Sequence, residues 1–156
     1  MDAVRLIAAT RGALARSEAP ADVLAEAWQA QALARTMAAH LAVSGPPELR
    51  HEALDLSEVS GRGTLGTSLG APLDSDGIRA TRLTSVADPR ASLIALGALL
   101  GEVGIALVGV ACAVDGEADY WQCIEAIDTA DDSHDRVLEM LRRLGGRGLG
   151  REVAGR

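Results

Sequence analysis

The sequence has no Lys, no Asn and no Phe among its 156 residues, and it has only two Cys. Without Lys, no Schiff-base amine, pyridoxal-phosphate anchor, Ser-Lys pair or P-loop Lys is available. Without Asn, a Cys-His-Asn triad is excluded. Cys112 and Cys123 are too few for a disulfide framework, so we expect both to be small buried apolar residues in a reducing cytoplasm.

Basic residues are outnumbered by acidic ones, and all of them are Arg. The count of 15 against 22 gives a formal net charge of -7. Duplex binding needs a concentrated basic face, so we expect no nucleic-acid partner. Residues 1–18 lack the basic and apolar regions of a signal peptide, which indicates a cytoplasmic protein.

The longest apolar stretch is residues 93–114, and Glu102 is the one charged residue in it. A helix that is apolar on every side belongs in a bilayer or at the centre of a bundle. The length suits a membrane span, but a lone carboxylate near the midpoint would be costly there. The remaining predicted helices are amphipathic and need an apolar partner. We therefore predict the central helix of a soluble bundle and no membrane partner.

Helical periodicity predicts four further helices, over residues 2–17, 19–43, 47–60 and 117–144. The second of these has the spacing of a left-handed bundle seam, with Val23, Ala27, Ala30, Ala34, Met37 and Leu41 on one face. The sequence therefore predicts an all-α fold, a four- to five-helix bundle around a buried central apolar helix. A long Gly-rich loop, residues 61–88, is expected between the third and fourth helices.

The chain is predicted to form a single domain over residues 1–145, followed by a flexible tail at 146–156. The loop contains two motif matches, a dinucleotide-type Gly61-x-Gly63-x-x-Gly66 and an elbow-type Gly66-Thr67-Ser68-Leu69-Gly70. Both motifs require a preceding strand and a following helix, and neither is predicted here. We therefore predict no catalytic residue in the loop.

One buried polar group is predicted where the last two helices meet. The last helix has heptad spacing that turns His134 toward the core, with Asp131 at the margin. In an antiparallel hairpin about Gly116, Glu102 comes level with Ala130, within one turn of both residues. A buried, unpaired carboxylate is costly, so Glu102 is expected to have a partner.

Two interpretations of this group remain open. In the first it is a structural layer that fixes helix register, with Gln31 or Arg35 contributing from the second helix. In the second it is a ligand or metal site inside the bundle. Trp28 lies on the same stripe as Gln31. The candidate ligand-binding residues are Glu102, Asp131, His134, Gln31 and Trp28.

An acidic row follows the outer face of the last predicted helix: Glu125, Asp128, Asp132 and Asp135. Bundles that hold metal between carboxylates need matching acidic residues on a second helix, and no such row is present. We interpret these residues as a solvated face, and predict no metal site and no cofactor.

Five segments carry a resemblance to a known family: MDAVRLIAAT at the start, AEAWQAQALA from Ala25, SGPPELR from Ser44, LGEVGIALVGVAC from Leu100 and YWQCIEAID from Tyr120. With these the chain resembles an uncharacterised family of small helical cytoplasmic proteins from filamentous soil bacteria with GC-rich genomes. The resemblance implies no activity, cofactor or catalytic residue. It favours an accessory role over a metabolic enzyme.

Two functions are consistent with the sequence. The first is a non-catalytic helical interaction or regulatory module, self-associating as a homodimer and with a protein partner yet to be identified. It follows from the incomplete catalytic motifs and the small-residue helix faces. The alternative is a small-molecule- or metal-binding bundle, or an enzyme built on such a bundle, that uses the buried Glu/Asp/His cluster.

Overall fold

The computed structural model describes the backbone of residues 1–62 and 78–154, and the side chains of residues 1–61 and 78–145. The described elements are α1 (Ala3–Arg16), α2 (Pro20–Ser44), η1 (Pro47–Leu49), α3 (Arg50–Arg62), η3 (Arg79–Arg82), α4 (Pro89–Ala113) and α5 (Glu117–Ala154). Apart from one isolated bridge between Asp2 and Ser85, the described residues contain no β-structure. The predicted all-α bundle is confirmed. Most of the predicted long loop, residues 63–77, lies outside the described residues.

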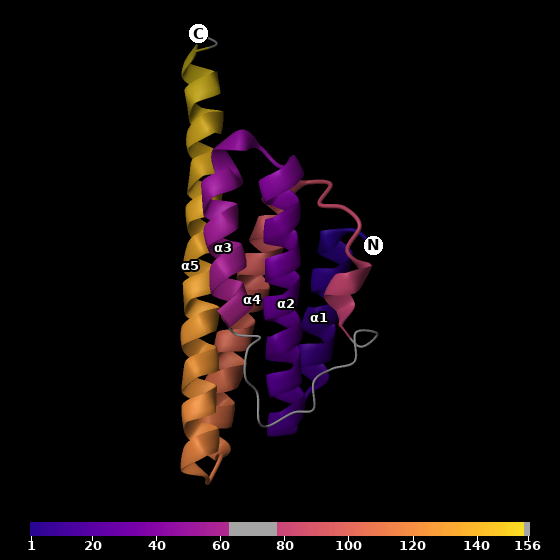
Figure 1. The fold of residues 1–156 in the computed structure, drawn as a ribbon, viewed down its shortest axis with the longest axis vertical. Coiled ribbons are helices and arrows are strands. Elements are labelled where there is room, and N and C mark those ends of the chain that lie inside the picture. Colours follow the sequence, from indigo (N-terminus) through magenta and orange to yellow (C-terminus); the bar gives the residue numbers. More distant parts are fainter. Residues whose placement is uncertain (63–77, 155–156) are drawn as a thin grey trace.

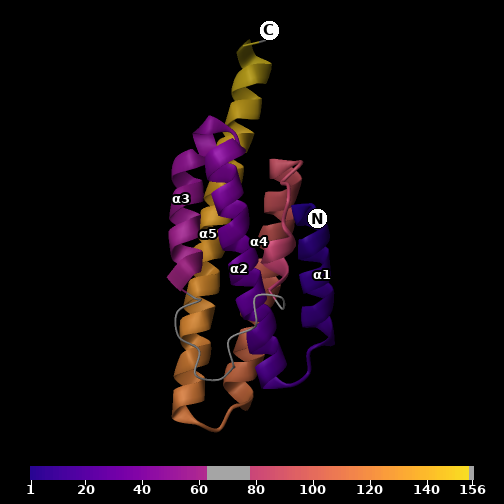
Figure 2. The same cartoon turned by 45° about the vertical axis from the view of Figure 1, so that its right-hand side comes forward.

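The helices form two layers (Figures 1 and 2). In one layer α4 lies between α1 and α5, and it contacts both. In the other layer α2 and α3 pack together, and α2 also packs on α4 and α1. The core between the layers is built mainly from Leu side chains, because each helix turns its apolar face inward. The α4 residues Leu93, Leu96, Leu99, Leu100, Val103 and Leu107 are all at most 1% exposed.

The helix starts follow from capping residues that the sequence places there. Asp88 accepts a hydrogen bond from Ala91 N at 3.1 Å, and Pro89 occupies the first turn, so α4 begins where the Asp-Pro pair predicted. At α1, Asp2 accepts from Val4 N at 3.1 Å and also from Ala87 N at 3.1 Å. Asp2 therefore caps α1 and ties it to the segment that leads into α4.

We expect Asp2→Ala to lower the free energy of unfolding by about 1 kcal/mol at neutral pH, because a cap is lost. The hydrogen bond from Ala87 N, with further bonds from Val4 and Ala3, lowers the pKa of Asp2 below 3.8. The stabilisation is thus present above that value and disappears as the pH falls through the lowered pKa. Urea unfolding of the wild-type protein and of Asp2→Ala, at neutral pH and in strong acid, measures the difference in their free energies of unfolding. Asp132→Ala, an exposed change on α5, is the control. A difference that persists undiminished in acid would contradict the capping role.

The last helix differs from its predicted extent. The α5 backbone continues through Gly145 and Gly146 to Ala154, so the end predicted at these glycines is wrong. Two successive glycines weaken a helix without forcing it to stop. The side chains of residues 146–156 lie outside the described part of the chain. The flexible tail and the domain limit at residue 145 therefore stay predictions.

Candidate interaction surface

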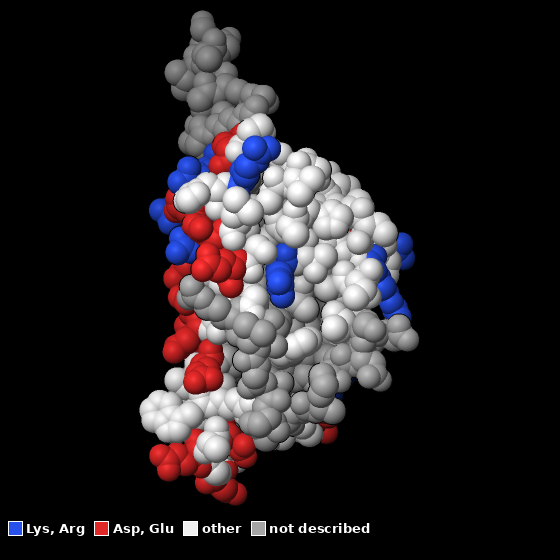
Figure 3. Space-filling view, viewed as in Figure 1, with Lys and Arg blue, Asp and Glu red and all other residues white. Residues whose placement is uncertain are grey.

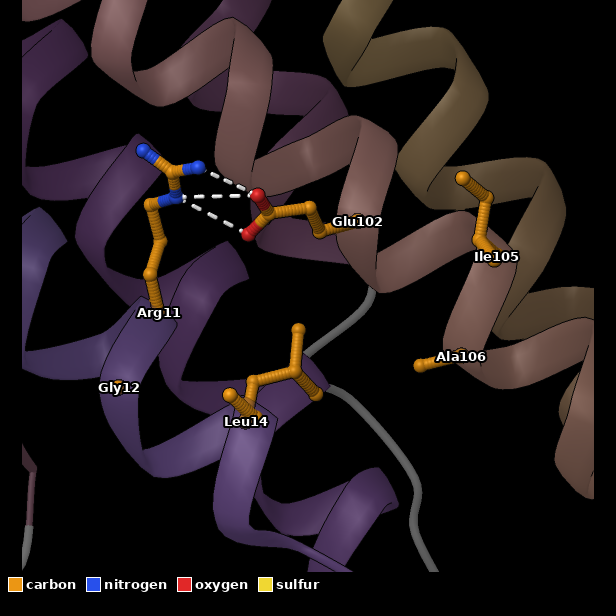
Figure 4. Close-up of a pocket in the computed structure, with 7 residues that line it drawn as sticks. Arg11, Gly12, Leu14, Glu102, Ile105 and Ala106 are labelled. Atoms are coloured by element: carbon orange, nitrogen blue, oxygen red, sulfur yellow. Dashed lines mark hydrogen bonds and ion pairs between the residues drawn. The ribbon is translucent and has the colours of Figure 1, made fainter.

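The predicted cluster of Glu102, Asp131 and His134 does not form. Glu102 points from α4 toward α1, where Arg11 Nε donates to Oε2 at 3.0 Å and to Oε1 at 3.2 Å, and Nη2 donates to Oε1 as well (Figure 4). The Arg11 and Glu102 side chains are 44% and 41% exposed. Glu102 does have a partner, as expected, but it is neither buried nor paired with the last helix.

Asp131 and His134 lie on the opposite flank of α4, against two glycines. A β-carbon added to Gly104 would stand 3.9 Å from Asp131 Oδ1, and one added to Gly97 would stand 4.0 Å from His134 Cδ2. These glycines are seven residues apart and share one helix face, whereas Glu102 is turned about 200° away from Gly104. The hairpin thus places the residues level, as predicted, but on different faces. Among the described residues no group of three or more His, Cys, Asp or Glu could hold a metal ion.

The Arg11–Glu102 pair closes one end of a groove between α1 and α4. The hydrogen bonds and the charge of Arg11 lower the pKa of Glu102, against an opposing effect of burial, so the carboxylate stays ionised in neutral solution. The groove has a volume of about 500 Å³, and apart from this pair its lining is apolar, with Leu14, Ile105 and Ala106 (Figure 4). The groove therefore joins an apolar surface to a neutralised ion pair.

The core does contain a polar layer, but around Gln31. Gln31 is 5% exposed, and its Oε1 accepts from Ser133 Oγ of α5 at 3.0 Å. Ser133 Oγ in turn lies 3.4 Å from Ser60 Oγ of α3. This layer links three helices, which is the structural role that the sequence assigned to Glu102. Sequence reasoning missed both serines, because small hydroxyl side chains do not interrupt a helical apolar pattern.

Trp28 lies one turn before Gln31 and lines the same small cavity of about 50 Å³. Gln31 Nε2 and Trp28 Nε1 are buried and have no hydrogen-bond partner among the described residues. A water molecule needs about 10–15 Å³ of such space, so the cavity has room for solvent or a very small molecule. Ligand binding by Gln31 and Trp28 stays a prediction.

One side of α4 is covered by no other described helix. We call this the α4 strip: Ala91, Ile94, Ala98, Gly101, Ile105, Val108 and Cys112. Its residues recur at alternating intervals of three and four, and all are apolar or small. Ile94 is 53% exposed, Ile105 77% and Val108 51%. A β-carbon added to Gly101 would meet no atom within 4 Å. The strip also holds Cys112, which is exposed, so its predicted burial is wrong, while the predicted burial of Cys123 is confirmed.

The two flanks of the α4 strip differ in charge. On the α1 side Arg11 is paired with the carboxylate of Glu102, so the two charges compensate each other. On the α5 side stands Asp131 beside Gly104, and Asp128 and Asp135 share its helix face by their spacing. All three Asp are exposed, and Figure 3 shows acidic side chains gathered along the edge that α5 forms.

A family model described as a family of unknown function, DUF6099, matches residues 1–143. The chain belongs to the DUF6099 family. The match includes the whole α4 strip and both flanks, and it confirms that the resemblance is to an uncharacterised family. No curated protein matches the chain, and no solved structure matches it.

The family description assigns DUF6099 no activity, so the physical character of the surface is the main guide to function. Among the described residues one helix, α4, is long and apolar enough to cross a membrane, with a mean hydropathy of 2.3. In the bundle 44% of that stretch is buried. The apolar residues of α4 thus form two surfaces, a face buried in the core and an uncovered strip outside it.

Proposed function

We propose that the protein is a non-catalytic, self-associating helical module whose α4 strip docks on a second copy of the chain. The observation that carries the proposal is the exposed row of apolar residues at heptad spacing on the most hydrophobic helix. Burial of apolar surface contributes about 25 cal/mol per Å², and contiguous exposed apolar surface is typical of interaction sites.

The composition of the surface supports a protein partner. The α4 strip contains no charged residue, and charged groups flank it on both sides, an apolar centre with a polar rim as in protein interfaces. Gly101 leaves the backbone open near the middle of the strip, so a second helix can approach closely. The sequence basis for an enzyme, the Glu102–Asp131–His134 cluster, is not assembled.

We expect Ile105→Glu to convert a dimer into a monomer. Ile105 is 77% exposed, so the variant should fold, but each dimer would have to bury two carboxylates without partners. At a few kcal/mol for each, the dissociation constant should rise at least about 100-fold. Sedimentation velocity over a range of protein concentrations measures this.

The matched control is Val43→Glu. Val43 is 85% exposed near the end of α2 and lies outside the α4 strip, so this variant should remain dimeric. A wild-type protein that stays monomeric at high concentration would contradict the proposal. A monomer that co-sediments with phosphatidylcholine vesicles, and loses this binding in Ile105→Glu, would assign the strip to a lipid surface instead and also overturn it.

A further inference from the structure

We infer that the two copies pair with their α4 helices parallel, so that α1 of each copy lies over α5 of the other. This inference rests on the proposed self-association and adds its geometry. It follows from the unlike flanks of the α4 strip, the compensated Arg11–Glu102 pair on one side and Asp128, Asp131 and Asp135 on the other.

When the two strips lie along each other over their whole length, twofold symmetry leaves two arrangements. A face-to-face dimer has its twofold axis in the plane of the interface, and each residue contact occurs twice. If the axis runs across α4, the helices are antiparallel and each flank meets its own counterpart, α5 against α5. If the axis runs along α4, the helices are parallel and each flank meets the opposite one, α1 against α5.

Electrostatics separate the two arrangements. The antiparallel pair brings Asp128, Asp131 and Asp135 toward the same three carboxylates, and like charges facing each other disfavour a complex. The parallel pair brings them instead toward the α1 flank, where Arg11 and Glu102 compensate each other and no carboxylate row faces them. The parallel arrangement is therefore favoured because it avoids the repulsion between two acidic flanks.

The heights of the charged residues also agree with parallel pairing. Arg11 is held at the level of Glu102, and Asp131 lies beside Gly104, two residues further along α4. At 1.5 Å per residue this is a difference of about 3 Å along the helix. Rotation about an axis along α4 preserves height, so Arg11 of one copy comes level with Asp131 of the other.

Cysteine cross-linking reads the orientation directly. In the parallel pair each residue of the α4 strip faces its own counterpart, so Cys112 of both copies comes together, within the Cα separation of about 4–7 Å that a disulfide needs. In the antiparallel pair Cys112 instead meets the region of Ala91, at the other end of the strip. Cys123→Ala removes the buried thiol and leaves Cys112 alone.

We expect the Cys123→Ala protein to form a covalent dimer under mild oxidation, seen by mass without reductant. A reference variant, Gly101→Cys with both natural cysteines changed to Ala, lies near the middle of the strip and should cross-link in either orientation. Val43→Cys in the same background reports random collision. The reference thus tests the proposed function separately from the orientation.

The outcomes are distinct. Cross-linking through both Cys112 and Gly101→Cys supports the inference. Cross-linking through Gly101→Cys but not Cys112, together with cross-linking between Cys112 protein and an Ala91→Cys variant lacking both natural cysteines, shows antiparallel pairing. That result overturns the inference and leaves the proposed function intact. If the cross-linked fraction at Cys112 and at Gly101→Cys is no higher than at Val43→Cys, the proposed function is overturned as well.

An equilibrium measurement with opposite signs provides a second test. In the parallel pair Asp131→Asn removes two attractions to Arg11, which Glu102 partly offsets, so the dissociation constant should rise about twofold or more. In the antiparallel pair the same change relieves repulsion and tightens the dimer. An unchanged or lower dissociation constant would therefore contradict parallel pairing.

Discussion

Leu100→Ala should lower the free energy of unfolding by about 3 kcal/mol. Leu100 is 1% exposed on α4, and truncating a buried Leu removes apolar burial and leaves a cavity that the neighbours only partly fill. Because α4 contacts α1, α2 and α5, the loss should appear as one cooperative shift in urea unfolding followed by far-ultraviolet circular dichroism.

The matched control for this prediction is Leu54→Ala. Leu54 is 56% exposed on α3, so the same chemical change should cost less than about 1 kcal/mol. Both variants are measured at the same protein concentration, because association also stabilises the fold. Equal losses in the two variants would show that α4 is not the centre of the core.

Glu26→Gln should cost about 2 kcal/mol, much more than Glu102→Gln. Glu26 accepts from Arg79 Nη1 at 2.6 Å and from Nη2 at 2.7 Å, and the two side chains are only 15% and 24% exposed. Removing the carboxylate charge leaves Arg79 largely buried without its counter-charge. The pair also holds η3 against α2, where Arg79 N donates to Gln29 Oε1 at 2.9 Å.

The Arg11–Glu102 pair is the comparison, because it has the same two-pronged geometry at the surface. With 44% and 41% of its side chains exposed, solvent replaces most of the interaction, and Glu102→Gln should cost less than about 1 kcal/mol. Thermal and urea unfolding of both variants provide the test. A larger loss in Glu102→Gln would refute the view that burial sets the strength of these two pairs.

The helices were largely predictable because their signals are local. Asp2 and Asp88 each precede an apolar periodic run, and both are helix caps in the structure. Helix ends were less predictable. Gly145 and Gly146 indicated an end to α5, yet glycine only weakens a helix, and the backbone continues to Ala154.

The candidate site was only partly predictable, for a geometric reason. Distance from the hairpin turn fixes how far along α4 Glu102 lies, but not the direction in which it points. A helix that is apolar on every side gives no pattern from which its rotation could be inferred. Arg11 was not identifiable as the partner because the chain offers 15 Arg and no spacing rule links two helices so far apart in sequence.

The α4 strip was present in the sequence but hidden there. Ile94, Ile105 and Val108 have heptad spacing, yet equally apolar rows run along the other faces of the same helix. Only the packing shows which row α1, α2 and α5 leave uncovered. Gln31 was correctly placed toward the core by its position on α2, since the period of that helix is clear.

The central claim is that two copies meet through the α4 strip, and an isotope-filtered nuclear Overhauser experiment tests it most directly. Carbon-13-labelled and unlabelled protein are mixed, and only contacts between copies are recorded. We predict cross-copy signals from the methyl groups of Ile94, Ile105 and Val108, all absent in Ile105→Glu. Cross-copy signals confined to other residues, or none at concentrations up to the solubility limit, would contradict the account.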